Sequence, residues 1–183
     1  CRDRGADTVT ISRGRGNRGR RRRARCQLDA EMPVEFAILG AGVSSGTLPG
    51  GTPEPVEAAC RTMEVNATAS VNMAGTLFAL MRPRKTGHVA CISSIAALYP
   101  LPDSPAYSAA KIALAYYAKA MRPLIRPVRV SVIYPGYVDT RMSRRLSGPQ
   151  PLRWPVEKAA AHIRERLEAG SDSIVFPRLL ALG

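Results

Sequence analysis

The segment 88–136 decides the fold. It reads "HVACISSIAALYPLPDSPAYSAAKIALAYYAKAMRPLIRPVRVSVIYPG", with a short apolar run at 88–93, an Ala-rich stretch at 104–122 and a second apolar run at 128–133. Short continuous apolar runs are typical of strands buried on both faces, and the Ala-rich stretch has the length and spacing of a helix. The segment therefore predicts two parallel strands joined by a crossover helix.

The same alternation of strand and helix continues on both sides. Upstream, the apolar run "VEFAIL" at 34–39 precedes a long stretch with helical spacing at 56–82. Downstream, a helix expected at 156–169 ends at Gly170, before the apolar run "SIVF" at 173–176. Alternating strands and helices predict an α/β fold with a parallel sheet.

Composition and cysteine spacing narrow the class of protein. A chain of 183 residues with 45% hydrophobic and 22% charged residues is ordinary for one soluble globular domain. No apolar run approaches the roughly 20 residues of a membrane-spanning helix. The four cysteines form no Cys-x-x-Cys pair and the two histidines stand apart, so we expect reduced thiols, a cytoplasmic protein and no metal site.

Positive charge is concentrated at the N-terminus. Ten arginines and two aspartates before Cys26 contribute +8 to the net charge of +13. Such a run can hold phosphates by counterion release, or it can be a solvated arm. Because aromatic residues that stack on bases are not interleaved with the arginines, we expect no specific nucleic-acid binding.

The basic segment also contains "GRGNRG" at 14–19, which formally matches the Gly-x-Gly-x-x-Gly pattern of dinucleotide-binding turns. That pattern functions when a helix follows it and packs an apolar face on a sheet. Here the next residues are mostly arginines with almost nothing to bury. We therefore interpret the segment as low-complexity sequence.

Glycines, a serine and a tyrosine follow the carboxyl ends of the expected strands. Ligands bind at these ends in parallel sheets. "GAG" at 40–42 follows the first run, Ser94 follows the second, and "YPGYVDT" at 134–140 follows the third. Tyr107 and Lys111 lie one helical turn apart and share a face. By itself the pair is compatible with a core tyrosine beside a snorkelling lysine, and the serine with a strand-end cap.

Taken together, these residues resemble the short-chain dehydrogenase/reductase family. Ser94 stands thirteen residues before Tyr107, which with Lys111 forms the Tyr-x-x-x-Lys pair. Pro135 and Gly136, followed by a threonine, resemble the nicotinamide-side loop of the family. The resemblance covers roughly 33–178 and implies a Rossmann-like parallel sheet with crossover helices.

The asparagine of the family's long helix has two candidates. Asn66 matches it better than Asn72 does, because Asn66 keeps the usual distance to Met81 and to the "GHV" that follows. If Asn66 has no catalytic role, it is a polar side chain that the flank of the helix tolerates.

The resemblance implies an NAD(P)-dependent oxidoreductase acting on a small-molecule alcohol or carbonyl compound, and a homodimer formed through helices 56–82 and 104–122. Tyr107 would exchange the proton, and Lys111 would lower its pKa from the usual value near 10. Ser94 would donate a hydrogen bond to the substrate oxygen, and Asn66 would hold a water that links Lys111 to solvent. The cofactor-binding residues implied are Arg13, Gly40, Ala41, Gly42, Tyr107, Lys111, Pro135, Gly136, Val138 and Thr140. Arg13 would favour NADP over NAD.

The chain also departs from the family's pattern. The usual "NNAG" reads Leu39-Gly40-Ala41-Gly42, and no Thr-Gly-x-x-x-Gly-x-Gly stretch precedes it. We therefore expect a fold whose N-terminal part is incomplete and an NADP(H) affinity of roughly 0.1 mM or weaker. The expected domains are a basic segment over 1–32, with one possible strand at "TVTIS", and a Rossmann-like catalytic domain over 33–183.

Two functional readings remain open. The chain is either an oxidoreductase or a catalytically silent, truncated relative that acts as an interaction module through its basic arm. The loop 141–155 is expected to cover the substrate, with Leu152 and Trp154 lining an apolar pocket, or alternatively to face solvent. The sequence does not identify the substrate.

Overall fold

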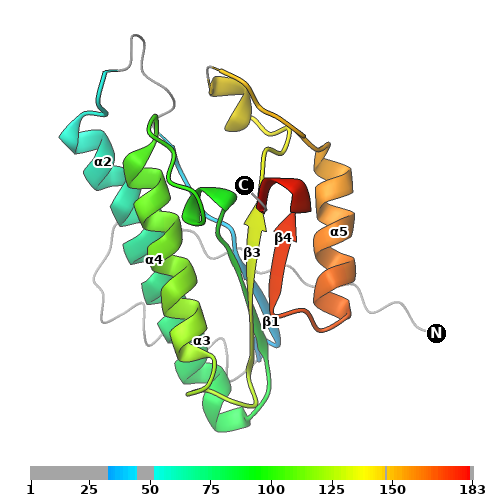
Figure 1. The fold of residues 1–183 in the computed structure, drawn as a ribbon. Coiled ribbons are helices and arrows are strands. Elements are labelled where there is room, and N and C mark those ends of the chain that lie inside the picture. Colours follow the sequence, from blue (N-terminus) through cyan, green and yellow to red (C-terminus); the bar gives the residue numbers. More distant parts are fainter. Residues whose placement is uncertain (1–32, 45–51, 147, 182–183) are drawn as a thin grey trace. The chain divides into compact units, whose positions relative to one another are not determined.

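The computed structural model describes residues 33–44, 52–146 and 148–181. Within them, a parallel sheet has the order β1-β2-β3-β4, and Figure 1 shows its strands running in the same direction. The strands are β1 (Phe36–Leu39), β2 (His88–Ile92), β3 (Arg129–Pro135) and β4 (Ser173–Phe176). The predicted α/β class and the four predicted strands are confirmed. The "TVTIS" segment, "GRGNRG" and Arg13 lie outside the described residues.

A helical segment connects each strand to the next. Between β1 and β2 the chain forms α2 (Val56–Met63), a π-helical segment (Glu64–Thr68) and α3 (Ala69–Arg84). Between β2 and β3 it forms α4 (Pro105–Met121), and between β3 and β4 it forms α5 (Val156–Glu168). In Figure 1, α3 and α4 lie on one side of the sheet and α5 on the other.

Two hydrophobic cores, one on each face of the sheet, pack it against the helices. Alternate residues of β3 face opposite ways, so that Val130 and Val132 pack toward α3 and α4 while Ile133 packs toward α5. The core on the α5 side consists of Ala90, Ile133, Ala159, Leu167, Ile174 and Phe176. Burial on both faces is therefore confirmed for β2 and β3.

The same expectation is wrong for β1. Phe36 is 48% exposed and Ile38 is 52% exposed, whereas the strand's other two residues pack against the α3–α4 core. The α5-side core draws on β2, β3 and β4, and no described helix covers that face at β1. The apolar run thus marks a strand that the described residues bury on one side.

The helix predicted at 56–82 is interrupted. The π-helical segment Glu64–Thr68 separates α2 from α3 and contains Asn66, which is fully buried. A π-helical turn widens the helix locally and is frequent at functional sites. Because this segment packs against α4, it brings Asn66 close to the helix that carries Tyr107 and Lys111.

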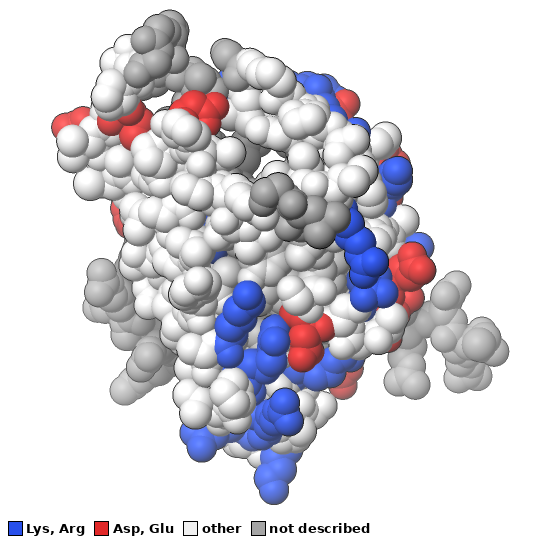
Figure 2. Space-filling view, in the orientation of Figure 1, with Lys and Arg blue, Asp and Glu red and all other residues white. Residues whose placement is uncertain are grey.

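Charge is unevenly distributed on the surface. Figure 2 shows Lys and Arg side chains gathered toward the end of this face where α3 and α4 finish, away from the carboxyl ends of the strands. Within the described residues, no helix combines the length and the apolar character that crossing a membrane requires.

Candidate active site

The turn after β1 lies against the buried part of α4. A methyl group in place of the Gly42 hydrogen would lie 3.4 Å from Asn66 Oδ1 and 3.5 Å from Lys111 Nζ. The "GAG" turn, the π-helical segment and α4 therefore meet at one point. Gly40 and Ala41, the other residues of the turn, are exposed.

Asn66 fixes the chain just beyond this turn. Its Oδ1 accepts a hydrogen bond from Val43 N, and its Nδ2 donates one to Val43 O, both at 2.8 Å. These two bonds satisfy both backbone groups of Val43 and hold the turn against the π-helical segment. The side chain that the resemblance implied for binding water is thus largely committed to the backbone.

Tyr107 and Lys111 come together at the start of α4. The Lys111 ammonium lies 5.6 Å from the centroid of the Tyr107 ring and donates a hydrogen bond to Ile92 O at 2.9 Å. The side chain of Ser94 lies close enough to the Tyr107 hydroxyl to lower its pKa. The end of β2 and the first turns of α4 therefore lie in contact at this point.

Burial dominates the pKa values at this site. It lowers the pKa of Lys111 from the usual 10.5 to about 8. It also raises the pKa of the Tyr107 hydroxyl, while the nearby side chain of Ser94 acts in the opposite direction. The net shift at Tyr107 in the cofactor-free protein is therefore upward, because desolvation of the phenolate is the largest influence, and the expectation that Lys111 lowers this pKa stays a prediction.

Ser94 also caps a short helix. Its hydroxyl oxygen accepts a hydrogen bond from Ala96 N at 3.1 Å at the start of the 3₁₀ helix Ile95–Ala97. The capping interpretation and the catalytic one are thus compatible, since the same oxygen lies beside Tyr107. The hydroxyl also lies 3.5 Å from Pro135 O, which places the end of β3 at the site.

Two positioning residues were missed by the sequence analysis. The buried hydroxyl of Ser93 donates to the backbone oxygen of Lys111 at 2.9 Å, which ties α4 to the end of β2. Glu54 Oε2 accepts a hydrogen bond from Ala106 N at 2.8 Å at the N-terminus of α4, where a carboxylate is favourable. The doublet Ser93-Ser94 was the available signal for the first; no sequence pattern indicated the second.

The Pro135-Gly136 segment passes close to the end of β4. Gly136 N donates to Phe176 O at 2.7 Å, and a methyl group on Gly136 would lie 3.0 Å from both Pro177 Cδ and Leu180 Cδ1. Such distances are shorter than ordinary carbon contacts. A side chain at this position would therefore require the neighbouring segment to move.

Ser143 organises the loop that contains Val138 and Thr140, the remaining expected cofactor-binding residues. The Ser143 hydroxyl donates to Val138 O at 2.6 Å and accepts from Thr140 N at 3.0 Å. Thr140 Oγ1 in turn accepts from Ser143 N at 3.2 Å. The Thr-x-x-Ser spacing was a signal for this reciprocal arrangement, and the sequence analysis did not use it.

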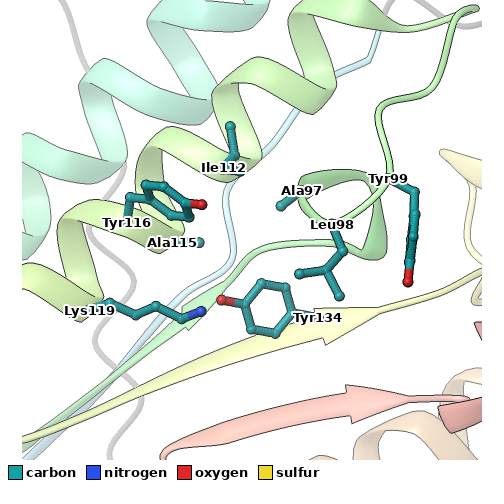
Figure 3. A pocket seen from close by; sticks show the side chains of 8 residues that line it. All are labelled: Ala97, Leu98, Tyr99, Ile112, Ala115, Tyr116, Lys119 and Tyr134. Atoms are coloured by element: carbon teal, nitrogen blue, oxygen red, sulfur yellow. The ribbon is translucent and has the colours of Figure 1, made fainter. Parts of the chain in front are cut away.

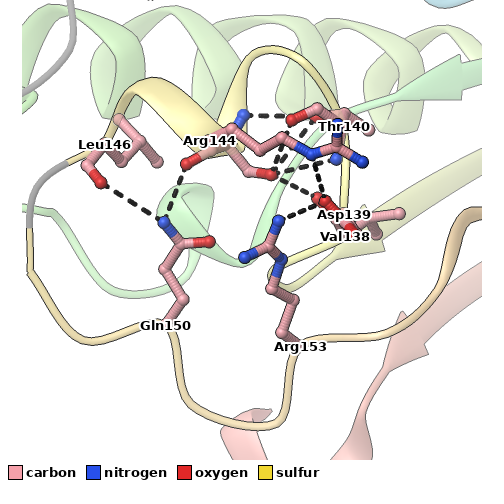
Figure 4. A network of polar contacts seen from close by, with 8 residues as sticks. Val138, Asp139, Thr140, Arg144, Leu146, Gln150 and Arg153 are labelled. Atoms are coloured by element: carbon pink, nitrogen blue, oxygen red, sulfur yellow. Dashed lines mark hydrogen bonds and ion pairs between the residues drawn. The ribbon is translucent and has the colours of Figure 1, made fainter.

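Two ion pairs and an amide reinforce this loop, as Figure 4 shows. Asp139 Oδ1 accepts from Arg144 Nε at 2.7 Å and also from Arg153 Nη2. Gln150 Nε2 donates to the backbone oxygens of Ser143 and Leu146. Contacts with the two arginines lower the pKa of Asp139, so the carboxylate stays ionised over the physiological range.

The apolar residues expected over the substrate lie elsewhere. Trp154 packs on Phe176 and His162, with ring centroids 5.0 and 5.5 Å apart. It thereby joins the core on the α5 side, and Leu152 remains exposed. The loop is therefore anchored through Trp154 to the second core of the sheet.

Most of the expected site residues converge. The described residues bring together Asn66, Ser94, Tyr107, Lys111 and Gly42, with Pro135 beside Ser94. Within the described ranges, no group of three or more His, Cys, Asp or Glu side chains is arranged to hold a metal ion.

Comparison with known proteins identifies the family of the chain. Residues 29–150 match a family model described as short chain dehydrogenase. An uncharacterized oxidoreductase of Myxococcus xanthus is 29% identical over 162 residues, which cover 85% of this chain and 62% of that protein. A Mus musculus protein named dehydrogenase/reductase SDR family member 7B is 31% identical over 143 residues, covering 76% of this chain and 43% of that protein.

A solved structure shares the fold. The crystal structure of a short chain dehydrogenase from Burkholderia cenocepacia in complex with NADP gives a TM-score of 0.73 at 26% identity, covering 87% of this chain and 67% of that chain. The chain spans less than two thirds of the length of the curated relatives described above.

Proposed function

The chain belongs to the short-chain dehydrogenase family, and from this premise we propose that Tyr107 and its neighbours form the catalytic site of an NAD(P)-dependent oxidoreductase. The reaction is hydride transfer between a nicotinamide and a small alcohol or carbonyl compound. The observation that carries the proposal is the convergence of Ser94, Tyr107 and Lys111 at the carboxyl end of the sheet, beside Gly42.

The residues at the site are compatible with a nicotinamide cofactor. Within the described residues, the Lys111 ammonium uses one of its three N–H donors, on Ile92 O, and it faces the Gly42 turn. The remaining donors suit the hydroxyl groups of a ribose. A bound nicotinamide would supply or accept the hydride. NADP is the first cofactor to test, because the Burkholderia cenocepacia relative was crystallised with it, and NAD is the alternative.

Tyr107 is the proposed acid and base. Because burial raises the pKa of its hydroxyl, the phenol is protonated at neutral pH and can donate a proton to a carbonyl oxygen during reduction. In the opposite direction the phenolate must form, and the Lys111 ammonium 5.6 Å from the ring favours it. In the cofactor-free protein Tyr107 is thus in the protonated form that reduction of a carbonyl compound needs.

Ser94 is the proposed donor to the developing alkoxide. Its oxygen is already oriented by Ala96 N, and its hydroxyl lies beside Tyr107. A donor fixed before the reaction stabilises developing charge without reorganisation. We assign Asn66 a supporting role: its bonds to Val43 hold the turn that faces Lys111.

A homodimer through α4 accompanies this proposal. The exposed side of the helix carries small residues at helical spacing, namely Ala109, Ala113 and Ala120. Ala110 and Ala115 of the same helix are buried and do not belong to this surface. We also assign the protein to the cytoplasm, which the scattered cysteines favour.

Oxidation of NADPH and of NADH, followed by absorbance with a panel of ketones and aldehydes, tests the function. Tyr107→Phe should lower turnover at least about 100-fold, since it removes only the proton donor. Tyr116→Phe, an exposed tyrosine on the same helix, is the matched control and should retain the wild-type rate. A second pair compares Ser94→Ala, which should lower the rate, with Ser131→Ala, a buried serine near the start of β3 that should retain it.

The alternative, a catalytically silent relative, gives a different result. It predicts no turnover above that of Tyr107→Phe with either cofactor. A Tyr107→Phe variant that keeps more than about a tenth of the wild-type rate, a barrier change below about 1.4 kcal/mol, would contradict the assignment of Tyr107 as the acid.

A further inference from the structure

A cavity lies along α4, outside the proposed catalytic cluster of Ser94, Tyr107 and Lys111. Its volume is about 370 Å³, within the range of pockets for small molecules. Three segments line it: the turn after Ser94, the outer part of α4 and the end of β3. Figure 3 shows the lining residues, Ala97, Leu98, Tyr99, Ile112, Ala115, Tyr116, Lys119 and Tyr134. Ser94, Tyr107 and Lys111 are not among them.

A buried hydroxyl without a partner marks this cavity as a binding site. Tyr134 is 2% exposed, and its hydroxyl makes no hydrogen bond to any described residue. The other residues of β3 on this face, Val130 and Val132, are apolar, so packing alone does not call for a hydroxyl there. An unpaired buried hydroxyl costs free energy, and a ligand group that pairs with it recovers that cost.

A cation lies next to this hydroxyl. Lys119 is exposed, and its ammonium is 5.3 Å from the centroid of the Tyr134 ring. In Figure 3 the ammonium and the Tyr134 hydroxyl point toward each other across one end of the cavity. Among the described residues, no carboxylate pairs with Lys119, and the cavity has no acidic lining residue. Two hydrogen-bond donors therefore converge where an anion can accept from both.

The rest of the wall combines aliphatic side chains with the rings and hydroxyl groups of Tyr99 and Tyr116. Ala97, Leu98, Ile112 and Ala115 contribute methyl groups and aliphatic chains, as Figure 3 shows. A ligand that satisfies both parts has an anionic end and a compact apolar body. A planar carboxylate accepts two hydrogen bonds at once, and an aromatic ring suits the aliphatic wall.

We propose that this cavity binds a small aromatic carboxylate, with the carboxylate between Lys119 Nζ and the Tyr134 hydroxyl and the ring against Leu98 and Ile112. The site is separate from the catalytic cluster and does not depend on the proposed oxidoreductase activity. It adjoins that cluster through the chain, since Ile112 follows Lys111 and Tyr134 precedes Pro135.

Calorimetric titration of the full chain with 2-naphthoate tests the site. We expect binding with one equivalent of ligand, and the neutral analogue 2-naphthalenemethanol should bind at least about tenfold more weakly. Lys119→Met should weaken 2-naphthoate binding by at least about tenfold, the loss expected for one charge-assisted hydrogen bond. The matched control is Lys158→Met. Lys158 belongs to α5 and lies over the Trp154 ring, so its replacement should leave the affinity unchanged.

Tyr134→Phe provides an independent arm. It should weaken 2-naphthoate binding about fivefold and leave the melting temperature of the unliganded protein unchanged or higher, because no internal hydrogen bond is lost. A lower melting temperature would show that the hydroxyl has a partner within the chain and would overturn the proposal. Three other results would also overturn it: equal affinity in wild type and Lys119→Met, loss of binding in Tyr107→Phe, or binding that weakens as protein concentration rises because a second copy covers the cavity.

Discussion

Replacing Lys111 by methionine tests how strongly the catalytic cluster is desolvated. Lys111 is 3% exposed, and burial lowers the pKa of its ammonium from 10.5 to about 8. Each unit of pKa corresponds to about 1.4 kcal/mol, so the buried charge costs about 3 kcal/mol relative to the unfolded chain. Methionine has a similar length and carries no charge, which removes this cost.

The sign of the pH dependence follows from proton binding. Between about pH 8 and pH 10.5 the unfolded chain keeps the proton on Lys111 while the folded chain loses it, so the lysine's contribution to stability rises with pH. Below pH 8 both states are protonated and the contribution is constant. The free energy of unfolding of the wild type, minus that of Lys111→Met, should therefore rise by up to about 3 kcal/mol across this window.

Other groups near Lys111 change stability in the opposite direction at high pH. Burial raises the pKa of Cys91 from 9.0 to about 12 and also raises the pKa of Tyr107, so the folded protein keeps protons that the unfolded chain loses. This lowers the stability of the wild type above about pH 9. Because both groups are present in both proteins, their contributions largely cancel in the difference.

Urea unfolding followed by far-UV circular dichroism measures this difference at roughly pH 7, 8.5 and 10. Lys119→Met, which changes an exposed lysine of the same helix, is the control and should differ from the wild type by the same amount at each pH. A wild-type minus Lys111→Met difference that stays within about 0.5 kcal/mol over the range would refute the desolvation of Lys111.

Four further substitutions test how the site is supported. Asn66→Leu should lower the free energy of unfolding by about 2 kcal/mol in urea titrations, because two hydrogen bonds to the half-buried backbone of Val43 are lost; a loss below about 0.5 kcal/mol would contradict their importance. Gly136→Ala should cost about 1–3 kcal/mol in the same assay through overpacking, and an unchanged midpoint would show that the neighbouring segment can move. Asp139→Asn should accelerate amide hydrogen exchange in the loop 140–153 while leaving the melting temperature unchanged, since the lost ion pairs are at the surface; unaltered exchange would mean that Ser143 alone orders the loop. Ala113→Arg should convert the dimer to a monomer in sedimentation at micromolar concentration, and a wild type that is already monomeric would refute the proposed interface.

The sequence predicted the elements well because their signals are local. The strand expected at 88–93 is β2 at His88–Ile92, and the helix expected at 104–122 is α4 at Pro105–Met121. What it missed depends on three-dimensional neighbours. The π-helical segment Glu64–Thr68 leaves helical spacing almost unchanged, and the exposure of Phe36 depends on which helix covers the sheet.

The site shows the same division between local and spatial information. Tyr107 and Lys111 were found because their spacing within one helix is a local pattern. The upward pKa shift that burial causes at Tyr107 was not foreseen, because the sequence shows a nearby charge but not the extent of burial. Ser143 was missed since it acts through the backbone of other residues rather than on a substrate.

Three buried polar residues bear on the choice between an oxidoreductase and a silent relative. Asn66 bonds the backbone of Val43, Ser93 bonds the backbone of Lys111, and Ser143 bonds the loop after β3. Each fixes a different segment around Ser94, Tyr107 and Lys111. These bonds also stabilise the fold, because backbone groups left without a partner cost free energy. A site that must hold its reacting groups in a fixed geometry also requires them. Their presence therefore favours the oxidoreductase over the silent relative.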